Sequence, residues 1–344
     1  MQFRTSATLA GAMAGLLSLA IAAPAFAGKT IDAIKARGQL VCGVNTGLAG
    51  FSAADSQGNW SGLDVDICKA IAATLLSDAT KIKWAPLNAQ QRFTALQSGE
   101  VDVLSRNTTF TLTRDASLGL LSTTPTYYDG QGFMVTKKSK ITSAKQLKNA
   151  EICVQSGTTT EKNLNDYFKG QNIKIKSVVF EGFEASVKAF FSGRCQAYTT
   201  DASGLASIRN KEAKNPEDYV ILPELISKEP LGPMVRRGDE EFYAIVKWVV
   251  YALLEAEEYG ITQENVDMMK TSTDPAIARI LGTSEDTGKL LGLDKDWAYR
   301  AIKAVGNYGE IFERNVGPKS ALKLPRGLNN LWSKGGIQYA MPIR

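Results

Sequence analysis

Histidine is missing from this chain altogether. Its absence excludes nucleophile triads and general bases built on histidine, and most zinc and iron sites. The four cysteines lie too far apart for the CxxC spacing of metal sites. We therefore expect no metal and no cofactor, and an enzyme here would have to work with carboxylates, Lys, Tyr or Cys.

Blocks of one charge sign are also absent. The 344 residues include 40 Lys and Arg and 35 Asp and Glu, for a formal net charge of +5. The two signs are interspersed, so the sequence indicates no nucleic-acid groove and no nucleic-acid partner. After the first residues no apolar run reaches the length of a transmembrane helix, and we expect a mature chain that does not span a membrane.

The first residues have the pattern of a secretory signal. Arg4 supplies a positive start, Leu9 to Ile21 is apolar, and Ala25-Phe26-Ala27 is an A-x-A cleavage site. A signal-anchor helix is the alternative, but the apolar run is short for a span. We predict cleavage after Ala27, which makes 1–27 a signal peptide and leaves a soluble protein exported to the periplasm.

Export permits disulfides among Cys42, Cys68, Cys153 and Cys195. One pair in each half of the chain, Cys42 with Cys68 and Cys153 with Cys195, is the interpretation we prefer among three connectivities. Four free buried thiols remain the alternative, most of all for the first pair.

Strands alternate with helices in both halves of the chain. Strands are expected at Gln39–Val44, Lys81–Ala85, Val101–Leu104, Ile152–Gln155, Lys174–Phe180 and Cys195–Thr199, with helices between them at Leu63–Leu76, Ala89–Ser98 and Phe183–Ser192. This alternation predicts βαβ units and a mainly parallel sheet in each half. The fold class is α/β, with two lobes and a ligand cleft between them.

The lobe boundaries follow from two crossing segments. Gly130-Gln131-Gly132 fits a hinge crossing, and Leu231 to Arg236 fits the return. Lobe 1 is then discontinuous, 28–130 and 233–344, and lobe 2 is 131–232. The end of lobe 1 is expected to be helical, at Glu241–Tyr259, Thr262–Lys270, Pro275–Leu281 and Asp296–Tyr308.

A polar stretch, Ser105 to Asp115, follows the predicted strand Val101–Leu104. Strand ends in open α/β sheets are where ligands bind. Hydroxyls and backbone N–H groups followed by Arg114 suit a carboxylate, which arginine binds with two parallel hydrogen bonds. The alternative is a threonine-rich loop with a helix-capping threonine and a solvated arginine.

Lobe 2 carries a complementary pattern. Thr158 and Thr159 follow a strand and open a helix, and Asp201 ends another strand. A helix N-terminus favours anions, and aspartate favours an ammonium group. Helix capping by Thr158, with Glu161, and by Asp201 is the alternative for each. Together with Arg114, these residues predict a clamp for an α-amino acid.

Seven segments resemble a known family at its spacing: Gly43–Phe51, Gly62–Asp66, Arg92–Asp102, Ser105–Asp115, Tyr127–Phe133, Gln155–Glu161 and Arg194–Gly204. The chain resembles the periplasmic solute-binding proteins of polar amino acid ABC importers (solute-binding protein family 3), and within them the general L-amino-acid-binding subgroup. The resemblance implies a monomer that captures an L-amino acid by hinge closure and delivers it to membrane permease subunits.

The resemblance also implies a set of ligand-binding residues. The carboxylate would be held by Arg114 with Thr109 and the backbone near Asn107, the amine by Asp201, and Arg92 matches a second arginine of acidic-amino-acid binders. The full expected set is Asn45, Leu48, Arg92, Asn107, Thr108, Thr109, Arg114, Thr158, Thr159 and Asp201. Leu48 stands where many members have an aromatic residue, which favours a broad pocket.

Two other functions stay open at this point. The first is a binding protein narrow for glutamate and aspartate, which Arg92 would favour. The second is a secreted dehydratase-type enzyme on the same fold. Without histidine such an enzyme would depend on Asp201 or a glutamate, so we expect binding and no catalysis.

Overall fold

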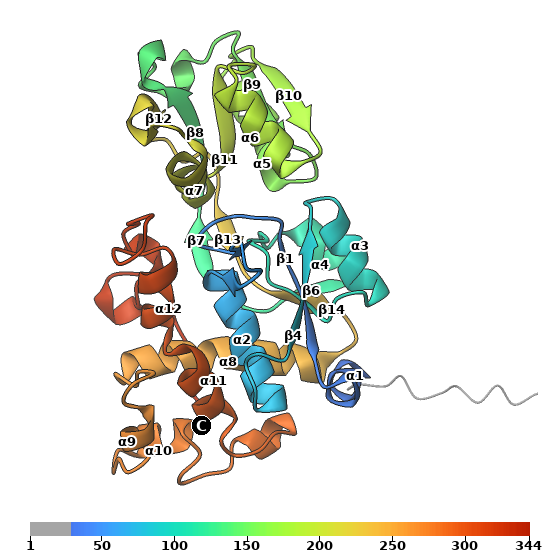
Figure 1. Ribbon diagram of the computed structural model, residues 1–344, viewed down its shortest axis with the longest axis vertical. Helices are drawn as coiled ribbons and strands as arrows, with labels where there is room; N and C mark the ends of the chain where they lie inside the picture. The colour runs from blue at the N-terminus through green and yellow to red at the C-terminus, as the bar shows by residue number, and fades with distance from the viewer. Residues whose placement is uncertain (1–28) are drawn as a thin grey trace, which may run out of the picture.

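The computed structural model describes residues 29–344, and the predicted signal peptide lies outside the described residues. The chain forms two sheet-and-helix lobes joined by a narrow waist (Figure 1). Each lobe is built on a five-stranded sheet. Lobe 1 denotes here the part on the first sheet, and lobe 2 the part on the second. This is the two-lobe α/β fold that the sequence predicts.

The first sheet has the order β4-β1-β5-β14-β6. Its strands are β1 (Leu40–Asn45), β4 (Ile82–Leu87), β5 (Val103–Leu104), β6 (Leu120–Ser122) and β14 (Met234–Arg236). The pairs β1–β4 and β1–β5 are parallel, whereas β14 is antiparallel to both of its neighbours. The helices of this half are α1 (Lys29–Arg37), α2 (Leu63–Leu76), α3 (Gln91–Ser98) and α4 (Leu112–Ser117).

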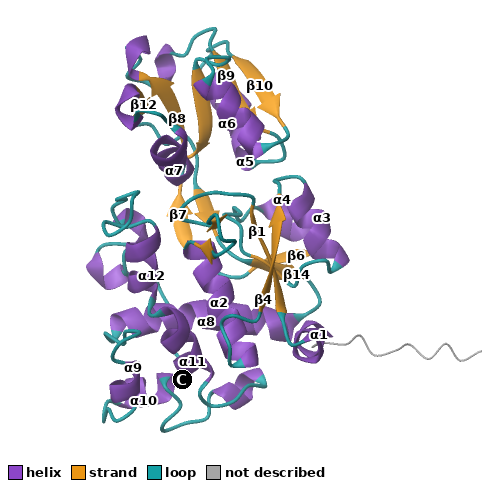
Figure 2. Ribbon diagram, in the orientation of Figure 1, coloured by secondary structure: helices purple, strands orange, loops and turns teal. Residues whose placement is uncertain are grey.

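The second sheet repeats this arrangement with the order β10-β9-β11-β8-β12. Its strands are β8 (Gln131–Thr136), β9 (Glu151–Gln155), β10 (Lys176–Phe180), β11 (Ala197–Asp201) and β12 (Tyr219–Ile221). In this sheet β10, β9 and β11 are parallel, and β8 is antiparallel to β11 and β12. Helices α5 (Thr159–Gly170), α6 (Phe183–Phe191) and α7 (Ala202–Glu212) complete this lobe (Figure 2).

Two short strands connect the lobes. β7 (Tyr127–Asp129) and β13 (Glu229–Leu231) pair in antiparallel fashion, with Glu229 opposite Asp129. In Figure 1 they lie between the two sheets. All strands of the first sheet fall within 28–130 and 233–344, and those of the second within 131–232. The exact lobe boundaries stay predictions.

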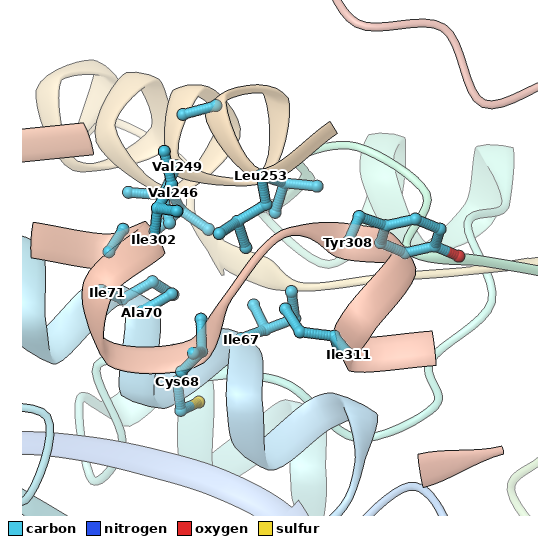
Figure 3. Close-up of a cluster of buried hydrophobic side chains, with 14 of the residues drawn as sticks. Ile67, Cys68, Ala70, Ile71, Val246, Val249, Leu253, Ile302, Tyr308 and Ile311 are labelled. Carbon is cyan, nitrogen blue, oxygen red and sulfur yellow. The ribbon is translucent and has the colours of Figure 1, made fainter. Parts of the chain in front are cut away.

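The C-terminal helices pack on lobe 1. They are α8 (Glu240–Glu258), α9 (Val266–Met269), α10 (Pro275–Ile280), α11 (Trp297–Val305) and α12 (Tyr308–Asn315). Figure 3 shows Ile67 and Ile71 of α2 among side chains of α8, α11 and α12, such as Leu253 and Ile302. Because α2 is apolar around most of its circumference, it can be buried between the sheet and these helices.

The predicted helix Asp296–Tyr308 is wrong in one respect. It is divided into α11 and α12, because Gly306 has a φ of 75° and Asn307 caps the second helix. The Asn307 side chain accepts from the Glu310 N–H, and the Glu310 side chain accepts from the Asn307 N–H, which is a capping box. The predicted helix Thr262–Lys270 is regular only over α9.

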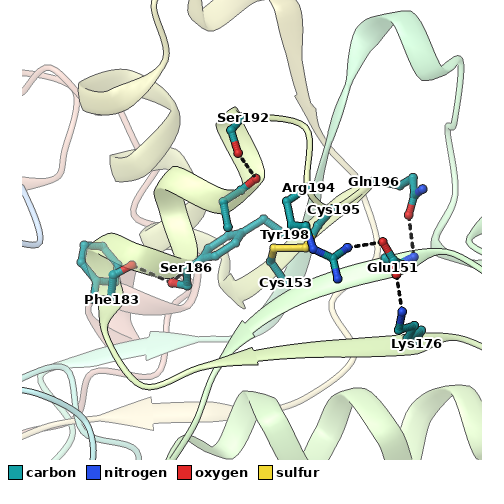
Figure 4. Close-up of a disulfide and its surroundings, with 11 residues drawn as sticks. Glu151, Cys153, Lys176, Phe183, Ser186, Ser192, Arg194, Cys195, Gln196 and Tyr198 are labelled. Carbon is teal, nitrogen blue, oxygen red and sulfur yellow. Dashed lines mark hydrogen bonds and ion pairs between the residues drawn. A yellow bond between two sulfur atoms is a disulfide. The ribbon is translucent and has the colours of Figure 1, made fainter.

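Both predicted disulfides are present. Cys42–Cys68 joins β1 to α2, and Cys153–Cys195 joins β9 to the segment that enters β11. Figure 4 shows the second bridge beside Glu151, which pairs with Lys176 and Arg194. Each bridge therefore links elements within one lobe. No helix of residues 29–344 is both long and apolar enough to cross a bilayer.

Candidate ligand-binding cleft

A cavity lies between the lobes at the carboxyl ends of the parallel strands, the edge where open α/β sheets bind ligands. Asn45 ends β1, Gln155 ends β9 and Asp201 ends β11. The lining residues are Asn45, Leu48, Arg92, Arg106, Asn107 and Thr109 from lobe 1, and Gln155, Thr158, Thr159, Thr160, Phe183, Thr200, Asp201 and Gly204 from lobe 2.

The lobes touch each other around this cavity. The Gln90 side chain donates to the Ser156 hydroxyl at 3.0 Å, and Ser207 donates to the Ala49 carbonyl at 2.9 Å. The Asn210 amide donates to the Ala321 carbonyl at 3.2 Å. The structure thus has the lobes in contact, and the cavity receives side chains from both of them.

Arg92 is a buried charge of the lobe 1 wall. Its Nη1 donates to the Thr108 hydroxyl at 3.3 Å and its Nη2 to the Gly157 carbonyl of lobe 2 at 3.4 Å. Its Nε has no hydrogen-bond partner within the described residues. Burial lowers the pKa of Arg92 well below its usual value, and the charges of Arg106 and Arg114 lower it further. This guanidinium group therefore favours a negatively charged partner.

Arg106 also lines the cavity, and the sequence analysis did not include it in the site. Its Nε donates to the Leu87 carbonyl at 2.8 Å. Burial lowers its pKa to about 10, against the opposing charge of Asp64. The Asp64 carboxylate in turn accepts from the Asn107 backbone N–H at 2.7 Å and holds this residue at a φ of 38°. The position of Arg106 just after β5 was the sequence signal that could have placed it in the site.

Arg114 lies beside the cavity and lines an adjoining groove with Phe93, Thr158 and Thr159. Its Nη1 donates to the Thr109 carbonyl at 2.8 Å. The guanidinium carbons of Arg92 and Arg114 lie 4.7 and 4.9 Å from the centre of the Phe93 ring. One aromatic ring thus supports both arginines. Burial lowers the pKa of Arg114 to about 10, opposed by Glu229 and Asp201.

The capping alternatives for the threonines are partly realised. Thr111 caps α4 by accepting from the Arg114 N–H at 3.2 Å. Thr158 caps α5 by accepting from the Glu161 N–H at 3.1 Å, and its hydroxyl donates to the Gln155 carbonyl at 2.7 Å. Thr158 therefore combines a capping role with a place in the cavity wall.

Asp201 is the acid of the lobe 2 wall. It stands at the N-cap position of α7, yet its side chain makes no capping hydrogen bond. It is 8% exposed. Burial raises the pKa of its carboxyl well above the usual range, and the nearby acids Asp129 and Glu229 raise it further. A cation in the cavity would stabilise the ionised form of Asp201.

Asp129, in β7, is a second acid close to Asp201, and it is partly buried. It accepts from the Ser203 backbone N–H at 3.3 Å and from the Ser203 hydroxyl. Burial raises its pKa to about 6, while the hydrogen bonds from Ser203 lower it. These hydrogen bonds occupy Asp129, whereas Asp201 borders the cavity itself.

Glu229 is a functional candidate that the sequence analysis missed. It is 1% exposed and starts β13. Its Oε2 accepts from the hydroxyls of Thr109 at 2.6 Å and Thr159 at 2.9 Å. Its Oε1 accepts from Asn163 at 2.8 Å and Ser227 at 2.6 Å. A lone glutamate in a crossing segment gives no sequence signal, because the partners come from distant segments.

The structure brings most of the predicted site residues together. Eight of them line the cavity: Asn45, Leu48, Arg92, Asn107, Thr109, Thr158, Thr159 and Asp201. Thr108 and Arg114 do not line it. The Thr108 hydroxyl accepts a hydrogen bond from Arg92, and Arg114 borders the adjoining groove. The lining residues that were not predicted are Arg106, Gln155, Thr160, Phe183, Thr200 and Gly204.

The charged cavity thus lies between two α/β lobes, at the ends of their strands. Residues 40–265 match the family of bacterial extracellular solute-binding proteins, family 3. The chain belongs to this family. As the sequence predicted, its relatives are amino-acid-binding proteins of ABC transporters.

Two of these relatives match almost end to end. The "General L-amino acid-binding periplasmic protein AapJ" of Rhizobium johnstonii is 58% identical over 338 residues, which are 98% of this chain and 99% of that protein. The "Glutamate/glutamine/aspartate/asparagine-binding protein BztA" of Rhodobacter capsulatus is 53% identical over 326 residues, 94% of this chain and 96% of that protein.

A solved structure shares the whole arrangement. The "ABC transporter / periplasmic binding protein from Brucella ovis with glutathione bound" superposes with a TM-score of 0.90 at 56% identity. The match covers 92% of this chain and 99% of that one. The two lobes and the C-terminal helices are therefore common to both proteins.

Proposed function

We propose that this protein captures L-α-amino acids in the cleft between its lobes and delivers them to the permease of an ABC importer. One observation carries the proposal: a buried guanidinium, Arg92, and a buried carboxylate, Asp201, border the same cavity from different lobes. An α-amino acid presents a carboxylate and an ammonium on one carbon, so it can neutralise both groups at once.

The carboxylate of the ligand would be held by Arg92 and Arg114 on lobe 1. Both guanidinium groups lie over the Phe93 ring, and the Arg114 guanidinium donates to the Thr109 carbonyl. The ammonium would be held by Asp201 on lobe 2. Because the two ends of the ligand bind different lobes, the ligand favours the closed arrangement over the open one.

Broad specificity is supported by the relatives and by Leu48. The names of the two relatives include a general L-amino-acid binder and a binder of glutamate, glutamine, aspartate and asparagine. Glutathione, the ligand of the Brucella ovis structure, carries an α-amino acid group at its glutamyl end. We propose that polar and acidic amino acids bind here, since Leu48 leaves the pocket without an aromatic side chain at this position.

We propose a periplasmic monomer, released by cleavage after Ala27, that docks on permease subunits. The ligand leaves chemically unchanged, because Arg and Asp bind its two charged groups and the relatives named above are binding proteins. No cofactor, metal or nucleic acid takes part.

Calorimetric titration with a panel of L-amino acids tests the proposal. We expect saturable binding of several polar or acidic amino acids with one site per chain. Analysis of the recovered ligand by mass spectrometry checks that it is unchanged. Absence of binding by every α-amino acid would refute the function, and conversion of the ligand would favour an enzyme.

A further inference from the structure

Glu229 is surrounded by hydrogen-bond donors. Two hydroxyls, Thr109 and Thr159, donate to its Oε2, and the Asn163 amide and the Ser227 hydroxyl donate to its Oε1. An ionised carboxylate is an acceptor only, and its two oxygens can accept all four of these bonds. The arrangement therefore fits an ionised Glu229.

The two threonines connect this buried carboxylate to the cavity. Thr109 lies in the segment after β5 of lobe 1, and Thr159 is the first residue of α5 of lobe 2. Their hydroxyl oxygens lie 3.4 Å apart, and both residues line the cavity while Glu229 is 1% exposed. Glu229 thus acts on the cavity wall from behind, through these two hydroxyls.

A hydroxyl has a single proton and two lone pairs. Because Glu229 Oε2 takes the protons of Thr109 and Thr159, at 2.6 and 2.9 Å, both hydroxyls can only accept from a ligand. An ammonium group has three donors and no acceptor. Thr109 of lobe 1 and Thr159 and Asp201 of lobe 2 all line the cavity and offer acceptors to it.

We propose that Glu229 is a positioning residue that fixes the direction in which the ligand binds. It turns Thr109 and Thr159 into acceptors, so their hydroxyls bind the ammonium of the ligand and the arginine guanidinium groups bind its carboxylate. This inference rests on the proposed function and changes one part of it. The sequence analysis expected the threonine hydroxyls to donate to the carboxylate, and with Glu229 behind them they cannot.

Two ligands that differ only in the ammonium group test this inference. L-Glutamate and glutarate are titrated into the wild type and into Glu229→Leu, which removes the acceptor and the charge. We expect the affinity for glutamate to fall by about tenfold or more, as for loss of a charge-assisted hydrogen bond. We expect the affinity for glutarate to rise, because two hydroxyl protons become free to donate to its carboxylate.

A purely structural role of Glu229 would weaken both ligands alike. A fall in glutamate affinity with no gain for glutarate therefore overturns the inference, as does an unchanged ratio of the two affinities. Glu229→Gln keeps one oxygen that can accept from both threonines, so its ratio should lie between those of the wild type and Glu229→Leu. The matched control is Glu224→Gln, a hydrogen-bonded glutamate of lobe 2 whose partners are Ser143 and Ala144.

Thr159→Val tests the same idea without altering Glu229, should Glu229→Leu fail to fold. The valine removes an acceptor from the wall, so we expect glutamate to bind more weakly and glutarate to bind at least as tightly as before. Equal losses for both ligands would show that the hydroxyl donates to a carboxylate. Thr159→Ser retains the hydroxyl and should behave as the wild type does. Failure of the wild type to bind any amino acid is a separate outcome, which refutes the function itself.

Discussion

The two lobes share one sheet topology but present opposite charges to the cavity. In each sheet the first three strands of the order are parallel, the fourth is antiparallel to both of its neighbours, and the fifth again runs with the first three. The edge of lobe 1 carries Arg92 and Arg106, whereas that of lobe 2 carries Asp201. The same backbone arrangement therefore supplies two half-sites, and the side chains after the strands decide which end of a zwitterion each one takes.

The lobes also differ in what lies behind the sheet. One large hydrophobic cluster in lobe 1 joins the sheet, α2 and the C-terminal helices. In lobe 2 the buried side chains form two smaller clusters. Lobe 1 is thus the larger body, and part of its C-terminal segment reaches lobe 2 through the Ala321 carbonyl.

The largest effect is expected from removing the acid of lobe 2. Asp201→Asn should weaken amino-acid binding by about 100-fold or more, because truncating one member of a buried charge pair costs roughly 2–5 kcal/mol. Titration calorimetry measures this loss. Asp218→Asn, an exposed acid of the same lobe, is the control and should leave the affinity unchanged. Near-native affinity in Asp201→Asn would show that Asp201 does not bind the amine of the ligand.

Removing Arg114 from lobe 1 should have an effect of similar size. Arg114→Ala is expected to abolish measurable binding, or weaken it by about 100-fold, since it removes one of the two guanidinium groups proposed to hold the carboxylate. Phe93→Leu should weaken binding by about tenfold, because the ring supports both arginines. Phe93→Tyr retains the ring and should bind normally. If Arg114→Ala binds normally, Arg92 alone holds the carboxylate.

The acid of lobe 2 also predicts a pH dependence. The pKa of Asp201 is raised in the free protein, and a bound ammonium favours its ionised form, so binding releases a proton where Asp201 is protonated. Affinity should then rise with pH, by up to about tenfold per unit below the raised pKa. Calorimetry in two buffers of different ionisation enthalpy measures the released protons. A pH dependence that persists in Asp201→Asn would contradict this assignment.

The smallest effect concerns the C-terminal segment of lobe 1. The Asn329 side chain accepts from the Tyr128 N–H at 2.6 Å and donates to the Tyr128 carbonyl at 3.0 Å, which fastens this segment to β7. Asn329→Ala should lower the free energy of unfolding by about 1–3 kcal/mol. The affinity for the amino acid should change only a few-fold, because the lost contact alters how easily the hinge moves.

Thermal unfolding and titration calorimetry measure these two effects. Asn330→Ala is the neighbouring control, since the Asn330 amide bonds within its own loop, to the Lys334 carbonyl. Equal stability of Asn329→Ala and the wild type would show that the segment does not support the hinge.

Much of the architecture could be predicted from local pattern. The apolar run of α2, the strand–helix alternation and the cysteine positions indicated two α/β lobes, each with its own disulfide. The break between α11 and α12 was missed, because the apolar pattern continues across Gly306. A backbone turn at one glycine changes the chain direction without interrupting the hydrophobic periodicity.

The site was predictable as far as it follows strand ends. Arg92, Thr109, Thr159 and Asp201 come after or between predicted strands, and all four line the cavity. Arg106 was passed over in favour of Arg114, although only Arg106 lines the cavity itself. The direction of a side chain at the end of a strand depends on neighbours such as Asp64 and Phe93, which the local sequence does not specify.

Sequence patterns alone predicted the two-lobe class and the supply of opposite charges, because these follow from periodicity and residue type. The disulfide pairing and the arrangement of charges and protons depend on which distant segments folding brings together. Glu229 lies 120 residues from Thr109 and 70 from Thr159, yet it accepts from both hydroxyls. Which group donates and which accepts is set by such distant contacts, because a hydroxyl takes its direction from whichever acceptor folding brings beside it.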